Sequence, residues 1–158
     1  LREVMLMSKI DEYQQYHRYE MGQGGNGAEL IIEEDNIGIW AQQGYGGVHH
    51  IAFRIEDLEE LYAWEEHFNN LNLHNSGYVD RFYFKSLYIR LYPNILFELA
   101  TEGPGFIDDQ EDYENLGETL TLPPHLRHHR ETVLKHLKQF DTTRSNKVFE
   151  KEYFDERK

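Results

Sequence analysis

The stretch HHIAFRIEDLEELYAWEEHFNN, residues His49 to Asn70, joins a strand pattern directly to a helix pattern. Two sets of side chains alternate at 49–55, which predicts a β-strand. One set is apolar apart from its first member and consists of His49, Ile51, Phe53 and Ile55, and the other consists of His50, Ala52 and Arg54. Asp57 then precedes apolar side chains at helical spacing, and aspartate is a preferred residue just before a helix. The stretch therefore predicts a strand followed by a helix that starts after Asp57.

Three more segments with strand character follow this helix. NSGY at 75–78 predicts a turn or a short strand, and the aromatic and β-branched stretch at 81–92 predicts a long strand. A Pro-Asn turn leads into ILFELAT at 95–101, which predicts a third strand. The predicted order from 49 to 101 is therefore β-α-β-β-β.

Residues 1–34 show the same order of predicted elements as the later half of this block, a helix followed by strands, without sequence identity to it. Residues 1–10 predict the end of a helix, and 16–21 and 28–34 predict two strands around a glycine-rich hairpin loop. The chain begins within a helix pattern, and no capping residue precedes that pattern. We therefore expect a piece of a longer protein, whose first module lacks its first strand.

An acidic loop and a helix pattern follow Phe106. Pro123 and Pro124 open this amphipathic pattern, and proline is well tolerated in the first turn of a helix. We predict three parts: a partial module at 1–46, a complete module at 47–106, and an acidic loop with a helical extension at 107–158.

Composition limits the classes of partner. The formal net charge is −13, which argues against nucleic acid or an anionic membrane. The chain has no cysteine, which excludes disulfides and fits the reducing cytoplasm, where we expect the protein. No apolar run approaches the ~18 residues of a membrane span, and no signal peptide is visible.

Strand alternation brings three chemically active side chains to one face of the predicted sheet. The apolar set of each strand should pack under the helix, and the other set should point away from it. His50, Tyr88 and Glu98 belong to this other set, so we expect them to share one concavity. An imidazole and a carboxylate on neighbouring strands are suitable ligands for a first-row metal ion.

Less specific interpretations of the same residues stay open. Glu98 would then form an ion pair with a residue such as Arg54, and His49 and His50 would be solvated or hydrogen-bonded in the core. A second histidine-rich segment, at 125–129, lies beside arginines, and we expect a solvated basic face there rather than a metal site.

Four motifs in this order resemble those of the ring-cleaving dioxygenases of the vicinal oxygen chelate superfamily, the glyoxalase and bleomycin resistance group. They are GVHHIAFRIED from Gly47, DRFYFKSLYIR from Asp80, ILFELATEGPGF from Ile95 and LGETLTLPPHL from Leu116. The resemblance implies an α+β fold of paired βαβββ modules, the first of them truncated here, plus a helical C-terminal extension. It makes this chain the C-terminal half of such an enzyme.

The resemblance also implies a reaction. The expected activity is cleavage of aromatic diols, such as hydroquinones or catechols, by dioxygen with Fe(II), or Mn(II), as the metal. The residues that match the family's metal ligands are His50 and Glu98, and the catalytic positions near the substrate fall on His49, Arg81 and Tyr88. The family's other metal histidine lies upstream of this chain, so we expect an incomplete ligand set. We expect a homodimer that covers the face with His50 and Glu98.

Two other functions stay compatible with the sequence. The same modules support metal-dependent lyases and isomerases of the glyoxalase type, whose turnover consumes no oxygen. They also form non-catalytic proteins that hold an aromatic ligand between tyrosine and tryptophan side chains. The candidates for such contacts here are Trp64, Tyr83, Tyr88 and Tyr92.

Overall fold

The computed structural model describes the chain as two compact units. The first unit comprises Leu1–Asp80 and Lys85–Glu102, and the second comprises Arg81–Phe84 and Gly103–Lys158. The described residues are 1–36, 38–39, 42–91, 94–107 and 113–143. No helix in these ranges is long and apolar enough to cross a membrane. The cytoplasmic location expected from the sequence stays a prediction.

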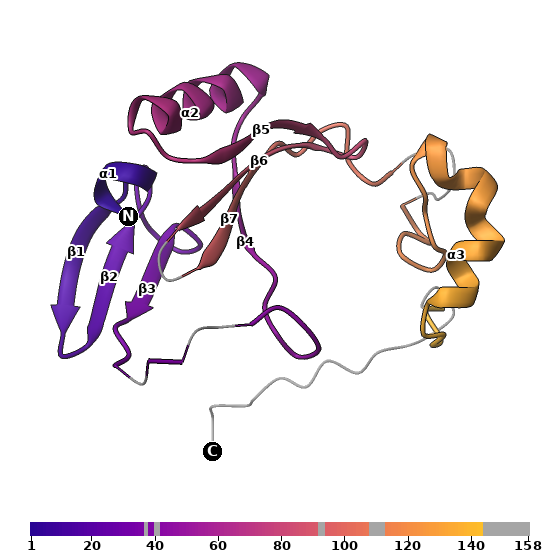
Figure 1. Cartoon of the computed structure of the whole chain (residues 1–158), viewed down its shortest axis with the longest axis horizontal. Coiled ribbons are helices and arrows are strands. Elements are labelled where there is room, and N and C mark those ends of the chain that lie inside the picture. Colours follow the sequence, from indigo (N-terminus) through magenta and orange to yellow (C-terminus); the bar gives the residue numbers. More distant parts are fainter. Residues whose placement is uncertain (37, 40–41, 92–93, 108–112, 144–158) are drawn as a thin grey trace. The chain divides into compact units, whose positions relative to one another are not determined.

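A four-stranded sheet with one helix forms the central part of the first unit (Figure 1). The elements in chain order are β4 (Ile51–Arg54), α2 (Leu58–Asn70), β5 (Asn75–Asp80), β6 (Lys85–Leu91) and β7 (Ile95–Ala100). The strand order in the sheet is β4-β7-β6-β5, and β4 runs parallel to β7 while the other neighbours are antiparallel. The predicted βαβββ arrangement is confirmed.

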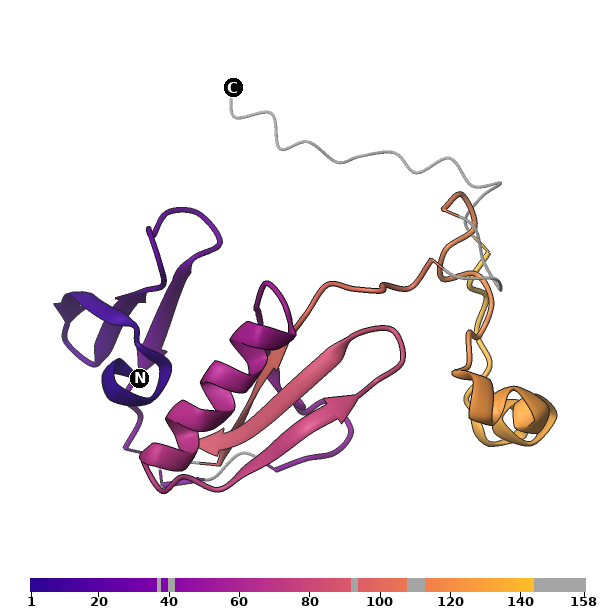
Figure 2. The ribbon, with the colours of Figure 1, turned by 90° about the horizontal axis from the view of Figure 1, so that it is seen from above.

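Helix α2 lies along one face of this sheet, as Figure 2 shows. Its side chains Leu61 and Phe68 are fully buried. The strand residues of the same core are alternate ones on β6 and β7, namely Leu87, Ile89, Phe97 and Leu99. The predicted apolar face of the sheet is therefore confirmed, and the intervening side chains point to the opposite face.

Helix α2 begins where the sequence predicts. The Asp57 carboxylate accepts a hydrogen bond from the backbone N–H of Glu60 (2.9 Å) and so satisfies one of the first-turn donors. The Glu60 carboxylate in turn accepts one from the backbone N–H of Glu56 (2.6 Å). These reciprocal bonds fix the corner between β4 and α2.

The strand predicted over 81–92 begins only at Lys85, so its predicted start is wrong. Phe82 has a φ of +68°, which is incompatible with an extended strand. The backbone N–H of Arg81 donates to the carbonyl of Phe84 (3.0 Å) and closes a turn there. The side chains of 81–84 therefore do not follow the alternation of β6.

A three-stranded antiparallel sheet precedes the βαβββ module. Its strands lie in the order β1-β2-β3. This part of the chain consists of α1 (Arg2–Met5), β1 (Ser8–Tyr13), β2 (Tyr16–Glu20) and β3 (Glu29–Glu33). The two strands predicted at 16–21 and 28–34 are confirmed.

The helix predicted over 1–10 is wrong beyond Met5. Leu6 has a φ of +51°, which ends the helix. The following segment, Ser8–Tyr13, pairs with β2 as a strand that the sequence did not reveal. All side chains of this strand are exposed, so its sequence lacks the alternation of a half-buried strand.

The N-terminal helix joins the core of the βαβββ module. Met5 and Met7 are buried in the same cluster as the apolar side chains of α2. The Nε2 atom of His67 on α2 lies within hydrogen-bond distance of the carbonyl oxygens of Glu3 (3.0 Å) and Val4 (3.2 Å). One apolar core and these polar contacts therefore connect α1 to α2.

The second unit contains the helix predicted after the acidic loop. It opens as the 3-10 helix η1 (Pro124–His129) and continues as α3 (Arg130–His136). His128 and His129 are exposed, as expected for a solvated basic face. The predicted three-part division, with limits at 46 and 106, stays a prediction.

Replacement of Leu61 by alanine should destabilise the first unit by about 2–5 kcal/mol, because it removes a fully buried side chain and leaves a cavity. Leu58→Ala on the same helix is the matched control, because Leu58 is 40% exposed and its replacement should change stability much less. Urea unfolding followed by circular dichroism measures both. Equal losses for the two variants would contradict the packing described here.

Candidate functional site

Glu98 is a carboxylate in the centre of an otherwise apolar strand. It lies on β7, opposite Ala52 of β4 on one side and Tyr88 of β6 on the other. Its neighbours Phe97 and Leu99 belong to the core, so Glu98 faces the opposite side of the sheet. Glu98 is only 2% exposed, and a buried carboxylate is unfavourable unless hydrogen bonds compensate for its lost hydration.

Three side chains provide that compensation. The Oε1 atom of Glu98 accepts hydrogen bonds from the hydroxyls of Ser86 (2.6 Å) and Tyr88 (2.5 Å). The Nε2 atom of His50 lies 2.7 Å from Oε2. Ser86 and Tyr88 are two residues apart on β6 and therefore share a face. The structure thus brings together His50, Tyr88 and Glu98, the three residues that strand alternation placed in one concavity.

His50 reaches Glu98 from the segment that leads into β4. The strand predicted from 49 begins at Ile51, so its predicted start is wrong and both histidines precede it. The contact forms because β4 runs parallel to β7, with Ile51 opposite Phe97. The His50 side chain stays 35% exposed, whereas that of Glu98 is 3% exposed. The pair therefore has one buried partner and one accessible from solvent.

His49 lies beside His50 rather than under the helix. Strand alternation places His49 with the apolar set, and this placement is wrong because the residue precedes the strand and is exposed. The Nδ1 atoms of the two rings are 2.8 Å apart, so one ring donates a proton and the other accepts it. His49 therefore fixes the ring orientation of His50.

The loop before the histidines has its own geometric constraint. A Cβ atom at Gly47 would lie 2.8 Å from the backbone carbonyl oxygen of Gln42, so only glycine fits without a shift of the loop. The side-chain amide of Gln43 donates to the carbonyl of His49 (3.0 Å). These contacts position the start of the histidine pair.

Ser86 is the site residue that the sequence analysis missed. It is fully buried and donates to Glu98. Ser86 belongs to the same alternating set as Tyr88, two residues earlier on the strand, and this spacing was available from the sequence. A small hydroxyl in an aromatic and apolar strand was the pattern that could have identified it.

The alternative partner expected for Glu98 is wrong. Arg54 pairs with Glu102 (3.1 Å between Nη1 and Oε1), and both side chains are exposed. Arg81 belongs to the second unit, and its predicted role near the substrate stays a prediction.

The aromatic side chains expected to hold a ligand have other packing partners. The ring of Trp64 packs on Phe68 with 5.6 Å between centroids, as part of the core. In the second unit the ring of Tyr83 stacks on Phe106 at 4.8 Å. Tyr92 lies outside the described residues. These packed rings give no support to the hypothesis of an aromatic ligand clamp.

The His50 and Glu98 pair fits part of a metal site. Two donor atoms in adjacent positions on a metal ion, each about 2.0–2.2 Å from it, lie about 3 Å from each other. This separation is close to the 2.7 Å between Nε2 of His50 and Oε2 of Glu98. A non-haem iron site usually has two histidines and one carboxylate. Within the part of the chain that the structure describes, no group of three or more His, Cys, Asp or Glu side chains could hold a metal ion. The described residues thus offer one imidazole and one carboxylate to a metal ion.

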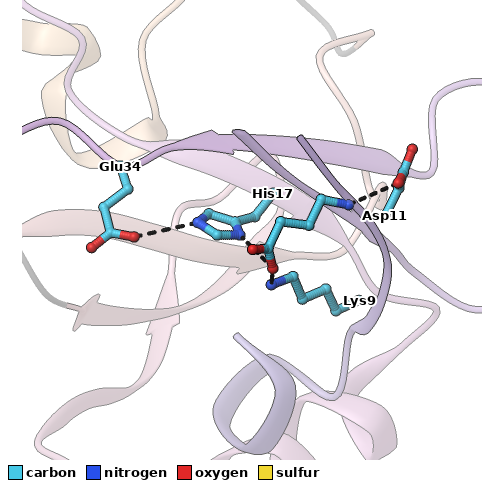
Figure 3. A network of polar contacts seen from close by, with 5 residues as sticks. Lys9, Asp11, His17 and Glu34 are labelled. Atoms are coloured by element: carbon cyan, nitrogen blue, oxygen red, sulfur yellow. Dashed lines mark hydrogen bonds and ion pairs between the residues drawn. The ribbon is translucent and has the colours of Figure 1, made fainter. Parts of the chain in front are cut away.

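His17, on β2 of the N-terminal sheet, lies between two carboxylates (Figure 3). Nε2 of His17 is 3.3 Å from Glu34, and Nδ1 is 3.5 Å from Glu12. The ammonium of Lys9 pairs with Glu12 and holds the pKa of that carboxyl below its usual value. The two carboxylates lie at opposite ring nitrogens and do not converge on one position. We interpret this network as partly exposed polar contacts, with the ion pair of Lys9 and Glu12 among them, that have a modest effect on stability.

Relatives of the chain are ring-cleaving dioxygenases by name. MhqA of Bacillus subtilis, provisionally named a ring-cleaving dioxygenase, is 46% identical over 119 residues, which cover 75% of this chain and 37% of MhqA. Chlorohydroquinone/hydroquinone 1,2-dioxygenase of Sphingobium indicum is 35% identical over 129 residues, which cover 76% of this chain and 38% of that enzyme. The chain thus spans less than half the length of these relatives. No family model matches the chain.

Solved structures agree with this relationship. A crystal structure of a provisionally named dioxygenase from Bacillus subtilis has a TM-score of 0.75 and 33% identity, over 87% of this chain and 43% of that chain. A glyoxylase/bleomycin resistance protein/dioxygenase domain from Frankia has a TM-score of 0.52 and 17% identity, over 66% of this chain and 79% of that chain. The second likeness concerns the fold alone. The predicted resemblance and the predicted α+β fold of the glyoxalase type are confirmed.

Replacement of Tyr88 by phenylalanine should destabilise the first unit by about 1–3 kcal/mol, because it removes a hydroxyl that donates to a buried carboxylate. Tyr62→Phe, on the exposed side of α2, is the matched control and should have little effect. Urea unfolding gives the free energies. A loss for Tyr88→Phe no greater than for the control would contradict the hydrogen bond.

Proposed function

We propose that the chain is part of a metal-dependent ring-cleaving dioxygenase that acts on aromatic diols such as hydroquinones or catechols. The observation that carries this proposal is the contact of His50 with the buried carboxylate of Glu98, within a chain homologous to ring-cleaving dioxygenases. The Sphingobium relative, whose name specifies chlorohydroquinone and hydroquinone, supports the substrate class. The activity is proposed for a whole protein, of which this chain supplies one βαβββ module and its support.

His50 and Glu98 are the proposed ligands of Fe(II), with Mn(II) as the alternative metal. Imidazole and carboxylate are common ligands of both ions, and no thiolate is present to select a softer metal. When bound, the metal brings diol and dioxygen together and mediates electron transfer between them. The remaining histidine ligand is proposed, on the family pattern, to lie upstream of this chain.

The other residues of the site act through hydrogen bonds and charge. The Tyr88 ring lies edge-on to the His50 ring with 6.4 Å between centroids, and its hydroxyl donates to Glu98, so its oxygen is placed to accept a hydrogen bond from a hydroxyl of a bound diol. His49 orients the His50 ring through the contact between their Nδ1 atoms. Arg81 is proposed, on the family pattern alone, to balance the negative charge of the phenolate.

Two rival functions predict different measurements. A metal-dependent lyase or isomerase of the glyoxalase type would use the same His50 and Glu98 pair but would consume no oxygen. A non-catalytic protein that binds aromatic ligands would be insensitive to chelators and to His50→Ala. Oxygen uptake with hydroquinones therefore separates the dioxygenase from both rivals.

The purified chain should bind Fe(II) or Mn(II) in the absence of oxygen, and His50→Ala or Glu98→Gln should weaken this binding by at least about 10-fold. This factor is a lower bound, because even residues that only support a metal ligand contribute about 10–100-fold to affinity. Bound metal is measured by plasma mass spectrometry after desalting. His74→Ala is the matched control, because His74 is an exposed histidine of the same unit.

Retention of metal by both ligand variants would contradict the proposed site. A whole protein that binds metal through these residues but consumes no oxygen with hydroquinones or catechols would contradict the dioxygenase and favour the lyase or isomerase.

We also propose that a second copy of the chain covers the sheet face opposite α2, as a homodimer. Ala52 and Arg54 on this face are exposed, and the ligand set described above is short of one histidine. Light scattering at micromolar concentration should therefore give about twice the mass of one chain. A stable monomer at that concentration would contradict the dimer.

A further inference from the structure

The two oxygens of the Glu98 carboxylate have different surroundings. Oε1 accepts two hydroxyl hydrogens, from Ser86 and Tyr88, whereas Oε2 has His50 Nε2 as its contact. A carboxylate oxygen offers about two lone-pair directions. The two hydroxyls occupy both directions of Oε1, so a further ligand can approach the carboxylate only at Oε2.

The two hydroxyl donors differ in how firmly they are held. Ser86 is fully buried, and its short side chain reaches Oε1 through a single rotatable bond from the backbone of β6. Tyr88 is partly exposed, and its long side chain stands at the edge of the site beside His50. Rotation of Glu98 would leave its charge without the Ser86 hydrogen bond, which is unfavourable for a carboxylate that is only 2% exposed.

We propose that Ser86 is a positioning residue that locks Glu98 in one orientation. Its hydrogen bond keeps Oε1 turned into the sheet and presents Oε2 alone beside His50, so that the carboxylate binds a divalent cation through one oxygen. Tyr88 adds a second hydrogen bond to Oε1 from the partly exposed side, while Ser86 provides the fully buried one. This inference rests on the proposed metal site.

The first test of this role needs no metal. In the intact chain labelled with ¹⁵N-histidine, the Nε2 proton of His50 should exchange with water about tenfold more slowly than that of the exposed His74. Ser86→Ala should remove this difference, because Glu98 can then rotate away from His50. Ser86→Thr, which retains the hydroxyl, should restore it.

A matched control separates positioning from general loosening of the sheet. Ser76 on β5 accepts a hydrogen bond from the backbone N–H of Tyr88 (2.8 Å) and does not contact Glu98. Ser76→Ala should therefore lower stability slightly and leave the His50 exchange rate unchanged. If Ser86→Ala fails to fold, Ser86→Cys replaces it with a side chain of similar size and a weaker donor, and the same direction of change is expected.

The second test uses Mn(II) alone, titrated by calorimetry and by its paramagnetic broadening of the His50 signals. Ser86→Ala should weaken Mn(II) binding by about 10–100-fold, as expected for a residue that supports a metal ligand. Tyr88→Phe should weaken it much less, because Ser86 still holds Oε1.

The two tests fail in different ways. Unchanged His50 exchange and unchanged Mn(II) affinity in a folded Ser86→Ala variant would overturn the positioning role, while the proposed function would stand. Absence of Mn(II) binding in the unaltered chain would overturn the proposed metal site, and with it the cation part of this inference. The His50 exchange rates would still decide whether Ser86 orients Glu98.

Discussion

The buried carboxylate of Glu98 is the constraint on which the arrangement of this site depends. A charge in the middle of a sheet, with a packed apolar core on the other face, is tolerated only if its oxygens are hydrogen-bonded. The partners come from β6, where Ser86 and Tyr88 lie, and from the segment before β4, where His50 lies. The βαβββ topology is what places these two parts of the chain on either side of β7.

The same constraint fixes the register of the strands. Phe97, Glu98 and Leu99 are consecutive, and a shift of β7 by one residue would bury the carboxylate under α2 and expose two core side chains. Burial on one face and hydrogen bonding on the other therefore select the same register. The helix cap at Asp57 supports this arrangement, because it fixes the corner through which β4 leads into α2.

The sequence predicted most of this module because alternation is reliable inside a strand that is buried on one face. It identified the core residues of β6 and β7, and it grouped His50, Tyr88 and Glu98. It failed where alternation does not apply: His49 precedes its strand, 81–84 form a turn, and the strand Ser8–Tyr13 is exposed on both faces. Ser86 was missed because a lone serine resembles an ordinary strand residue until its partner is known.

The site consists of a buried part, Glu98 and Ser86, and a solvent-accessible part, His50. Glu98 and Ser86 are buried and held by the sheet, whereas the His50 side chain is 35% exposed and is oriented by His49. A metal site needs this combination, because ligands must be fixed before the ion arrives and at least one side must stay open to the substrate. In the proposed metal site the described residues supply one imidazole and one carboxylate, so the third protein ligand of the family pattern would come from outside them and approach from the side where His50 is exposed. The buried half of the site is therefore the half that a single βαβββ module can build by itself.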